Sequence, residues 1–387
     1  MIFVTQLNID QFFENITIYN IFKMIIDLVY KYIGKGISKL DKDQPIGELR
    51  YSIRSVYDHL PFIRNIYIVM PDKSIEFIDK DKNSRIIYIN DNQLVDHPCF
   101  NSCVFEWNLW KLLDHGCSQC IIYLNDDYFI GRDCTPSTFF DKDRPYCLIN
   151  KDLHTISRDS IYRAWSFGDI INEKHFSKHD SLAFYHQRCN SMKFVSDLLN
   201  KDIKWHLSTY FFHNALGINL NDVKKLYDLI RSNYSNPEFL DASYRGRYDL
   251  QFQELYSIYI LNAMNATQKR ISAAYYRFPS FWSYLKNVRK LPTLYCINTD
   301  GKYQKPTELD KERFMTLMKK HYPTPFLGEI TKNNYEKFQI SKQNKDTIAI
   351  CIIIALICIC CMLILWKNIR SYRLLPRIND VIYIINA

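Results

Sequence analysis

Short apolar runs separated by amphipathic segments form the pattern of the first 330 residues. Four runs have the length and composition of buried β-strands, at 25–30, 66–70, 85–89 and 121–124. Between them, segment 48–56 places Leu49, Ile53 and Val56 at helical spacing. Segment 223–232 also has a helical pattern. This alternation predicts an α/β fold with a mostly parallel, Rossmann-like sheet and helical additions.

A different pattern follows near the C-terminus. Residues 347–366 contain no charged side chain and consist mostly of Ile, Leu, Cys, Ala and Met. Twenty such residues are enough to cross a hydrocarbon layer of ~30 Å, so this segment predicts a single transmembrane helix. We expect a linker at 331–346 and a basic tail at 367–387. Four Lys or Arg residues stand in each flank, so the charge pattern does not decide the orientation.

The N-terminal segment 1–24 has neither a basic start nor a long apolar run before a small-residue cleavage site, so it does not predict a cleavable signal peptide. We therefore expect a single-pass membrane protein, and the sequence leaves open on which side of the membrane its domain lies. Three Asn-x-Ser/Thr sequences, at Asn15, Asn233 and Asn265, would accept glycans only in a lumenal domain.

Charge and cysteine content restrict the classes of function. The net charge is +9, but 50 Lys and Arg are spread among 41 Asp and Glu without a basic run of five or more. This argues against nucleic acid as a partner. Cys99, Cys103, Cys117 and Cys120 have a spacing that could hold zinc. The first pair straddles a polar motif and the second enters a strand, so we expect no zinc site, and the pattern leaves disulfides open.

The strongest candidate for chemistry is Asn125-Asp126-Asp127, which directly follows the predicted strand 121–124. Ligands in α/β folds bind just beyond the carboxyl ends of strands. Two adjacent carboxylates repel each other, and their oxygen atoms are ligands that Mg²⁺ or Mn²⁺ prefers. The alternative is an Asn-Asp turn between two strands with no ligand.

Two basic side chains lie on one face of the predicted helix 48–56. Arg50 and Arg54 are four residues apart, and two guanidinium groups on one face can bind phosphate oxygens. The alternative is a solvated helix face on which Glu48 is an internal partner.

The sequence around these motifs resembles the Stealth family of hexose-1-phosphate transferases. The run Phe100–Glu106, the following helical segment, the Asn-Asp-Asp motif and Gly131 resemble the second conserved region of that family, which opens at Glu48. Further resemblances occur at residues 25–30, 212–215, 245–249, 294–298 and 322–326. The resemblance implies a catalytic domain over residues 25–330 with a Rossmann-like or GT-A-like sheet. The sequence departs from the family pattern at Lys31, Gly34, Ala215 and Thr299.

The resemblance implies that a sugar-1-phosphate moves from a UDP-sugar to a glycan or polysaccharide hydroxyl with release of UMP. Asp126, Asp127 and Asp249 would bind Mg²⁺ or Mn²⁺. Charge on the phosphate would be neutralised by Arg50, Arg54 and Arg247. The hydroxyl would be deprotonated by His213. The donor or the metal would be oriented by Asp27, Asn101, Ser102, Glu106 and Asn298.

Two alternatives to this function stay open. One is a metal-dependent glycosyltransferase that releases UDP, and the other is a Stealth-like protein that binds glycans or phosphates without turnover. Catalysis at one phosphate requires its groups to lie within a few ångströms of each other. The sequence hypothesis therefore predicts one shared cleft for Arg50, Arg54, Asp126, Asp127, His213 and Arg247.

Overall fold

The computed structural model describes residues 24–32, 47–71, 75–97, 99, 101–175, 180–205, 213–277, 281–285, 290–298 and 307–331. The chain divides into two compact units, Met1–Gly328 and Glu329–Ala387, and nearly all of the second unit lies outside these ranges.

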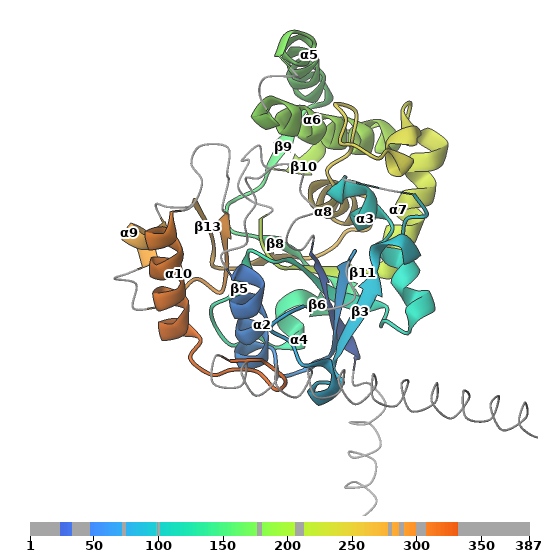
Figure 1. Ribbon diagram of the computed structural model, residues 1–387. Helices are drawn as coiled ribbons and strands as arrows, with labels where there is room; N and C mark the ends of the chain where they lie inside the picture. The colour runs from blue at the N-terminus through green and yellow to red at the C-terminus, as the bar shows by residue number, and fades with distance from the viewer. Residues whose placement is uncertain are drawn as a thin grey trace, which may run out of the picture. The chain divides into compact units, whose positions relative to one another are not determined.

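A five-stranded sheet occupies the centre of the first unit (Figure 1). Its order is β11-β4-β1-β2-β3. The bounds of these strands are β1 Ile26–Lys31, β2 Ile63–Met70, β3 Ile86–Asn90, β4 Cys120–Asn125 and β11 Leu216–Asn219. Strands β1 to β4 run parallel, as the alternation of strands and helices predicts, and β11 pairs antiparallel with β4.

Both faces of this sheet are buried, because successive side chains of a strand point to opposite faces and both sets are apolar. Val29 and Ile121 belong to one core cluster, whereas Leu28 and Ile122 belong to another. Helix α2, Glu48–His59, adds Leu49, Ile53 and Val56 to the second cluster. The first cluster includes residues of α3 Ser102–Trp107, η3 Leu109–His115, α7 Leu220–Asn233 and α8 Phe252–Asn262.

A helical hairpin, α5 Arg158–His175 and α6 Asp180–Leu199, packs on α8 and stands at the top of Figure 1. Smaller elements connect the rest: η1 Lys80–Lys82, η2 Asp91–Gln93, α4 Pro136–Phe139, β6 Phe140–Asp141, β7 Arg144–Pro145, β8 Cys147–Ile149, β9 His154–Ile156, β10 Ile203–Trp205, η4 Pro237–Asp241, β12 Gln268–Arg270, α9 Phe281–Leu285 and α10 Glu308–His321.

A three-stranded sheet in the order β13-β14-β5 adjoins the central one. Its strands are β13 Ala273–Arg277, β14 Leu294–Asn298 and β5 Tyr128–Ile130. Because β4 ends at Asn125 and β5 begins at Tyr128, only Asp126 and Asp127 separate the two sheets along the chain. Gly131 then allows a close approach, since a Cβ atom there would lie 2.1 Å from the Pro292 carbonyl oxygen.

The predicted transmembrane helix requires a correction. Among the described residues, no helix is both long and apolar enough to cross a membrane. The longest of them, α6, contains Arg188, Lys193 and Asp197, and such charges are expensive in hydrocarbon. The expected span, 347–366, lies outside the described residues. For the described residues, this finding corrects the fold class that includes a membrane helix and the single-pass localisation.

Helices α6 and α8 are joined by a buried ion pair. Arg188 donates through Nε to Glu254 Oε2 at 2.5 Å and through Nη2 to Oε1 at 3.0 Å, and Trp205 Nε1 donates to the same carboxylate at 2.9 Å. The arginine and glutamate side chains are 2% and 0% exposed, so water cannot solvate either charge if its partner is removed. Removing one partner therefore leaves an uncompensated buried charge.

We predict that Arg188→Met lowers the free energy of unfolding by about 3–5 kcal/mol. The double variant Arg188→Met/Glu254→Gln should recover most of this loss, because the amide oxygen still accepts from Trp205. Lys224→Met breaks an exposed pair with Asp228 and should cost less than about 1 kcal/mol. Urea unfolding of the four proteins measures these differences. Equal losses for Arg188→Met and Lys224→Met would contradict the structural role of the buried pair.

Candidate functional site

The carboxyl ends of β1 and β4 define the candidate site. Lys31 of β1 pairs with Asn125 of β4. The next strand after β1, which is β2, lies on the side of β1 away from β4, so the strand order changes direction between β1 and β4. Such a switch point leaves a crevice beyond the strand ends where ligands of α/β sheets bind. Asp126 and Asp127 continue from β4 into this position.

Asp127 is half-buried and lies against β14. Cys296 Sγ and Asn298 Nδ2 both donate to Asp127 Oδ2, at 3.2 and 3.3 Å. Desolvation and the neighbouring Asp126 carboxylate nevertheless raise the pKa of Asp127 to about 7. Asp127 therefore keeps its proton up to about neutral pH, because burial and the Asp126 carboxylate both disfavour its charged form.

The residues at this position suit a hard divalent cation. Mg²⁺ is commonly held by one or two carboxylates, while substrate phosphates and waters complete its shell. Asp126 and Asp127 supply two carboxylates, and a cation would relieve the repulsion that raises the pKa of Asp127. Asp249 does not join them, because within the described ranges no three His, Cys, Asp or Glu side chains form a group that could hold a metal.

A chain of buried polar groups runs from α3 to α8 behind the carboxylates. The Tyr123 hydroxyl lies 2.8 Å from Glu106 Oε1 and 2.9 Å from Asn125 Oδ1. Asn125 Nδ2 donates to the Tyr128 hydroxyl at 3.2 Å, which lies 3.3 Å from Gln253. Tyr123 has one proton for two acceptors, so both contacts are satisfied only when Glu106 is protonated. Burial raises the pKa of Glu106 to about 7, which allows this near neutral pH.

His213 lies beside this chain. Its ring centroid is 6.4 Å from that of Tyr128 and 5.1 Å from that of Tyr275. Burial, followed by the positive charges of Arg188 and Arg245, lowers the pKa of His213 to about 4. The imidazole is therefore neutral at physiological pH and can accept a proton.

A second group of predicted residues lies at the start of α3. Asn101 caps this helix through Cys103 N and donates through Nδ2 to Asp249 at 2.9 Å. Ser102 Oγ accepts from Arg245 Nη2 at 2.6 Å. Burial raises the pKa of Asp249 to about 6, while Asn101 and Arg245 oppose the shift. Asn101, Ser102 and Asp249 thus converge, although about 150 positions separate them in sequence.

Arg245, which the sequence analysis did not name, lies near several of the predicted residues. Its charge opposes the rise in the pKa values of Glu106 and Asp249 and contributes to the lowered pKa of His213, and its side chain is exposed. Arg247, which the sequence analysis named, stacks on the Tyr248 ring at 4.5 Å and donates to the hydroxyl of that residue. Both arginines belong to the same Arg-Gly-Arg motif.

Arg50 and Arg54 lie on the face of α2 opposite the one that contacts β5. On α2, Ser52 and Ser55 contact Tyr128 and Ile130 of β5, whereas residues 50 and 54 point to the opposite side of the helix. Arg50 stacks on Phe77 at 4.7 Å. Arg54 donates to the Tyr322 carbonyl oxygen at 2.8 Å. The described contacts thus give these two side chains structural partners.

Asp27 lies near the amino end of β1, four positions before Lys31 at the other end, which is a separation of roughly 13 Å along a strand. It is fully buried, and it accepts hydrogen bonds from Arg64 Nε at 2.9 Å and Ser118 N at 2.7 Å. These contacts join three segments at the amino end of β1, which is the end away from the crevice.

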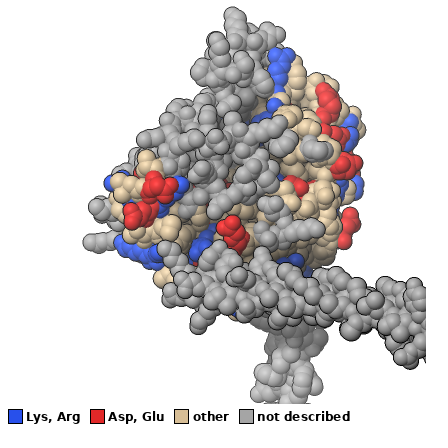
Figure 2. All heavy atoms as spheres, in the orientation of Figure 1, with Lys and Arg blue, Asp and Glu red and all other residues tan. Residues whose placement is uncertain are grey.

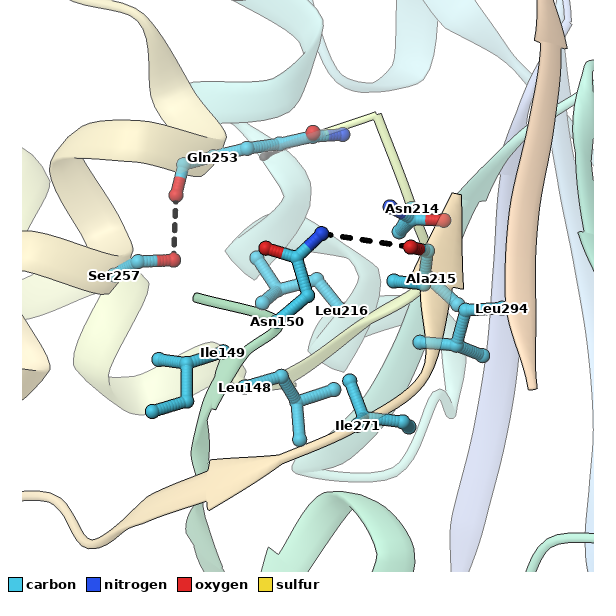
Figure 3. Close-up of a pocket in the computed structure, with 11 residues that line it drawn as sticks. Leu148, Ile149, Asn150, Asn214, Ala215, Leu216, Gln253, Ser257, Ile271 and Leu294 are labelled. Carbon is cyan, nitrogen blue, oxygen red and sulfur yellow. Dashed lines mark hydrogen bonds between the residues drawn. The ribbon is translucent and has the colours of Figure 1, made fainter. Parts of the chain in front are cut away.

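A small cavity of about 30 Å³ is lined by Asn214, the residue that follows His213 in the sequence (Figure 3). Leu148, Leu216 and Ile271 line its apolar part. Asn150 and Asn214 bring polar groups to it, and the side-chain oxygen of each is buried without a hydrogen-bond partner. The volume suits a bound water, which could donate to one or both of these oxygens.

Comparison with known proteins finds a family match in part of the chain. Residues 42–147 match the family model "Stealth protein CR2, conserved region 2". Over this region the chain is similar to Stealth proteins. Within this Stealth region lie α2, the Asn101–Glu106 segment and the Asp126–Asp127 turn.

Two curated relatives are capsular polysaccharide phosphotransferases. The protein from Neisseria meningitidis serogroup B is 41% identical over 99 residues, which are 25% of this chain and 26% of that protein. The Haemophilus influenzae protein is 25% identical over 217 residues, which are 55% of this chain and 53% of the relative. The matched part of this chain thus spans about half or less of the length of these two relatives.

Among solved structures, the galactosyltransferase LgtC in complex with donor and acceptor sugar analogues aligns over 80% of this chain and 99% of its own. The identity is 11% and the TM-score is 0.37, a likeness too distant to support a conclusion.

The Asp127 carboxyl should make stability depend on pH. Its pKa is raised from 3.8 to about 7 in the folded protein. Between these values the folded state binds more protons than the unfolded state, so the free energy of unfolding falls as pH rises from 4 through 7. In metal-free buffer, Asp127→Asn should flatten this fall and hold or raise the melting temperature at pH 7.5. Exposed Asp81→Asn should leave the wild-type profile unchanged.

We also predict that Mn²⁺ raises the melting temperature of the wild type and of Asp81→Asn, but raises that of Asp127→Asn much less, because an anionic ligand is lost. Thermal unfolding with and without Mn²⁺ measures these changes in melting temperature. Roughly 1–5 mM Mn²⁺ is enough to saturate weak sites. Equal stabilisation of all three proteins would show that Asp127 is not a ligand and that the segment is only a turn.

Proposed function

We propose that this chain transfers a hexose-1-phosphate from a UDP-sugar to a hydroxyl group of a glycan, forming a phosphodiester and releasing UMP. The observation that carries the proposal is the carboxylate pair Asp126–Asp127 at the switch point of the sheet, within a Stealth region 2. The names of the relatives, capsular polysaccharide phosphotransferases, support the same class of reaction.

The reaction requires one bond to form and one to break. The glycan oxygen attacks the β-phosphorus, and the bond from that phosphorus to the bridging oxygen breaks, so that UMP leaves. Asp126 and Asp127 would hold Mg²⁺ or Mn²⁺, which when bound would neutralise charge on the diphosphate. Such transfers depend mainly on positioning and electrostatics, which the residues around the turn supply.

In the proposed site, neutral His213 accepts the proton of the attacking hydroxyl. Its depressed pKa keeps the acceptor nitrogen available down to about pH 5. Arg245 offers its exposed guanidinium to the phosphoryl oxygens, and Ser102 orients it by accepting a hydrogen bond at 2.6 Å. Asn298 holds the Asp127 carboxylate at 3.3 Å in its position beside Asp126.

The nucleotide that is released decides between sugar-phosphate transfer and sugar transfer. We expect the purified full-length chain, with Mn²⁺, a panel of UDP-sugars and oligosaccharide acceptors, to release UMP in an acceptor-dependent reaction. Chromatography of the nucleotides measures this. Release of UDP would show transfer at the anomeric carbon instead, and no release with any donor would contradict the proposal.

Arg245 and Arg247 provide a matched pair of variants, because they lie two residues apart in one segment. Arg245→Ala should lower kcat about 10²–10³-fold, which is the usual effect of removing one donor to a transition-state oxyanion. Arg247→Ala should lower kcat less than tenfold, because its side chain stacks on Tyr248. Steady-state kinetics with saturating donor compares them. A larger effect at Arg247 would reverse the assignment of the phosphate-binding cation.

A further inference from the structure

A second and larger cavity lies away from the carboxylate pair, between the α5–α6 hairpin and the segment that follows α7. Its volume is about 380 Å³. This falls within the range of about 300–1,000 Å³ that small-molecule sites occupy. Asp126, Asp127, His213 and Arg245 are not among its lining residues.

Aromatic rings form much of the wall of this cavity. Trp165, Tyr234 and Tyr248 line it and are half-buried, and Phe194 behind them is buried. A half-buried ring presents one apolar surface to a ligand while the protein holds the rest. Aromatic surfaces of this kind match ligands that have an extended apolar face.

The remaining wall is polar but carries no excess charge. Asn233, Ser235 and Asn236 bring amide and hydroxyl groups to the cavity. Its cation, Lys193, donates to Asp197 at 2.7 Å, so the two charges cancel. This composition favours a neutral ligand with many hydroxyl groups over a phosphate or a carboxylate.

The rings are fixed by hydrogen bonds within the protein. Trp165 Nε1 donates to Asn190 Oδ1 at 2.8 Å, and the Tyr234 hydroxyl donates to the Tyr248 carbonyl oxygen at 2.7 Å. Because these side chains are already ordered, a ligand would lose little affinity to their immobilisation.

One backbone segment connects the cavity with the candidate active site. Asn190 Nδ2 donates to the Arg247 carbonyl oxygen at 2.9 Å on the cavity side. On the other side of the same segment, Arg245 donates to Ser102 and Asp249 accepts from Asn101. Residues 245–249 therefore contribute to both sites.

We propose that this cavity binds a neutral pyranose unit of the acceptor glycan, away from the hydroxyl that reacts. A pyranose has an apolar C–H face for the rings and hydroxyl groups for the amides. That the saccharide belongs to the acceptor rests on the proposed function. Saccharide binding itself can be measured without turnover.

The binding test uses the full chain without nucleotide and three neutral disaccharides, maltose, cellobiose and N,N′-diacetylchitobiose. We expect at least one to bind, as detected by saturation-transfer NMR and titrated by tryptophan fluorescence. Trp165→Ala should weaken that binding about tenfold or more, because the largest apolar surface of the cavity is lost. Trp110→Ala is the matched control, since Trp110 is also half-buried but packs on Tyr227 outside the cavity.

Binding by neither wild type nor control, or equal binding by Trp165→Ala and Trp110→Ala at equal melting temperatures, would overturn the proposal. If Trp165→Ala is less stable, Trp165→Phe replaces it and is expected to retain part of the affinity. Where the wild type transfers sugar phosphate, Trp165→Ala should raise KM for the glycan with kcat unchanged. A wild type that binds the disaccharide but releases no nucleotide would contradict the proposed function alone.

Discussion

Two carboxylates held side by side at the joint between two sheets are the constraint on which the rest of this structure depends. Asp126 and Asp127 are the only residues between β4 of the central sheet and β5 of the smaller one. Their repulsion is opposed by hydrogen bonds from Cys296 and Asn298 of β14. The smaller sheet therefore serves to hold a pair of charges that a folded protein would otherwise avoid.

The groups around this pair follow from the same constraint. Tyr30 lies at the carboxyl end of β1 and binds Ser52 of α2 at 2.8 Å, and Ser52 in turn donates to the Tyr128 carbonyl oxygen. These contacts fix α2 against β5 by its serine face. The two arginines of α2 lie on the opposite face of the helix. On the described surface seen in Figure 2, acidic and basic residues are interspersed.

Much of the central sheet could be predicted from the sequence, because its strands are continuous apolar runs whose pattern depends only on local residues. The Asp126–Asp127 turn could be predicted for the same reason, since polar residues end a buried run abruptly. The direction of a side chain on a helix or a loop depends on packing, which the sequence does not contain. Arg54 illustrates this, because its partner, the Tyr322 carbonyl oxygen, lies 268 positions away.

The shared segment 245–249 has an energetic consequence for the two ligands. If a saccharide in the cavity of Trp165 moves this segment, it also moves Arg245 and so changes the affinity for phosphate. Binding free energies at two linked sites are reciprocal, so a phosphate-bearing donor would change the affinity for the saccharide by the same factor. The order in which saccharide and donor bind would then depend on this five-residue segment. The protein could favour the complex with both ligands without any movement of its sheets.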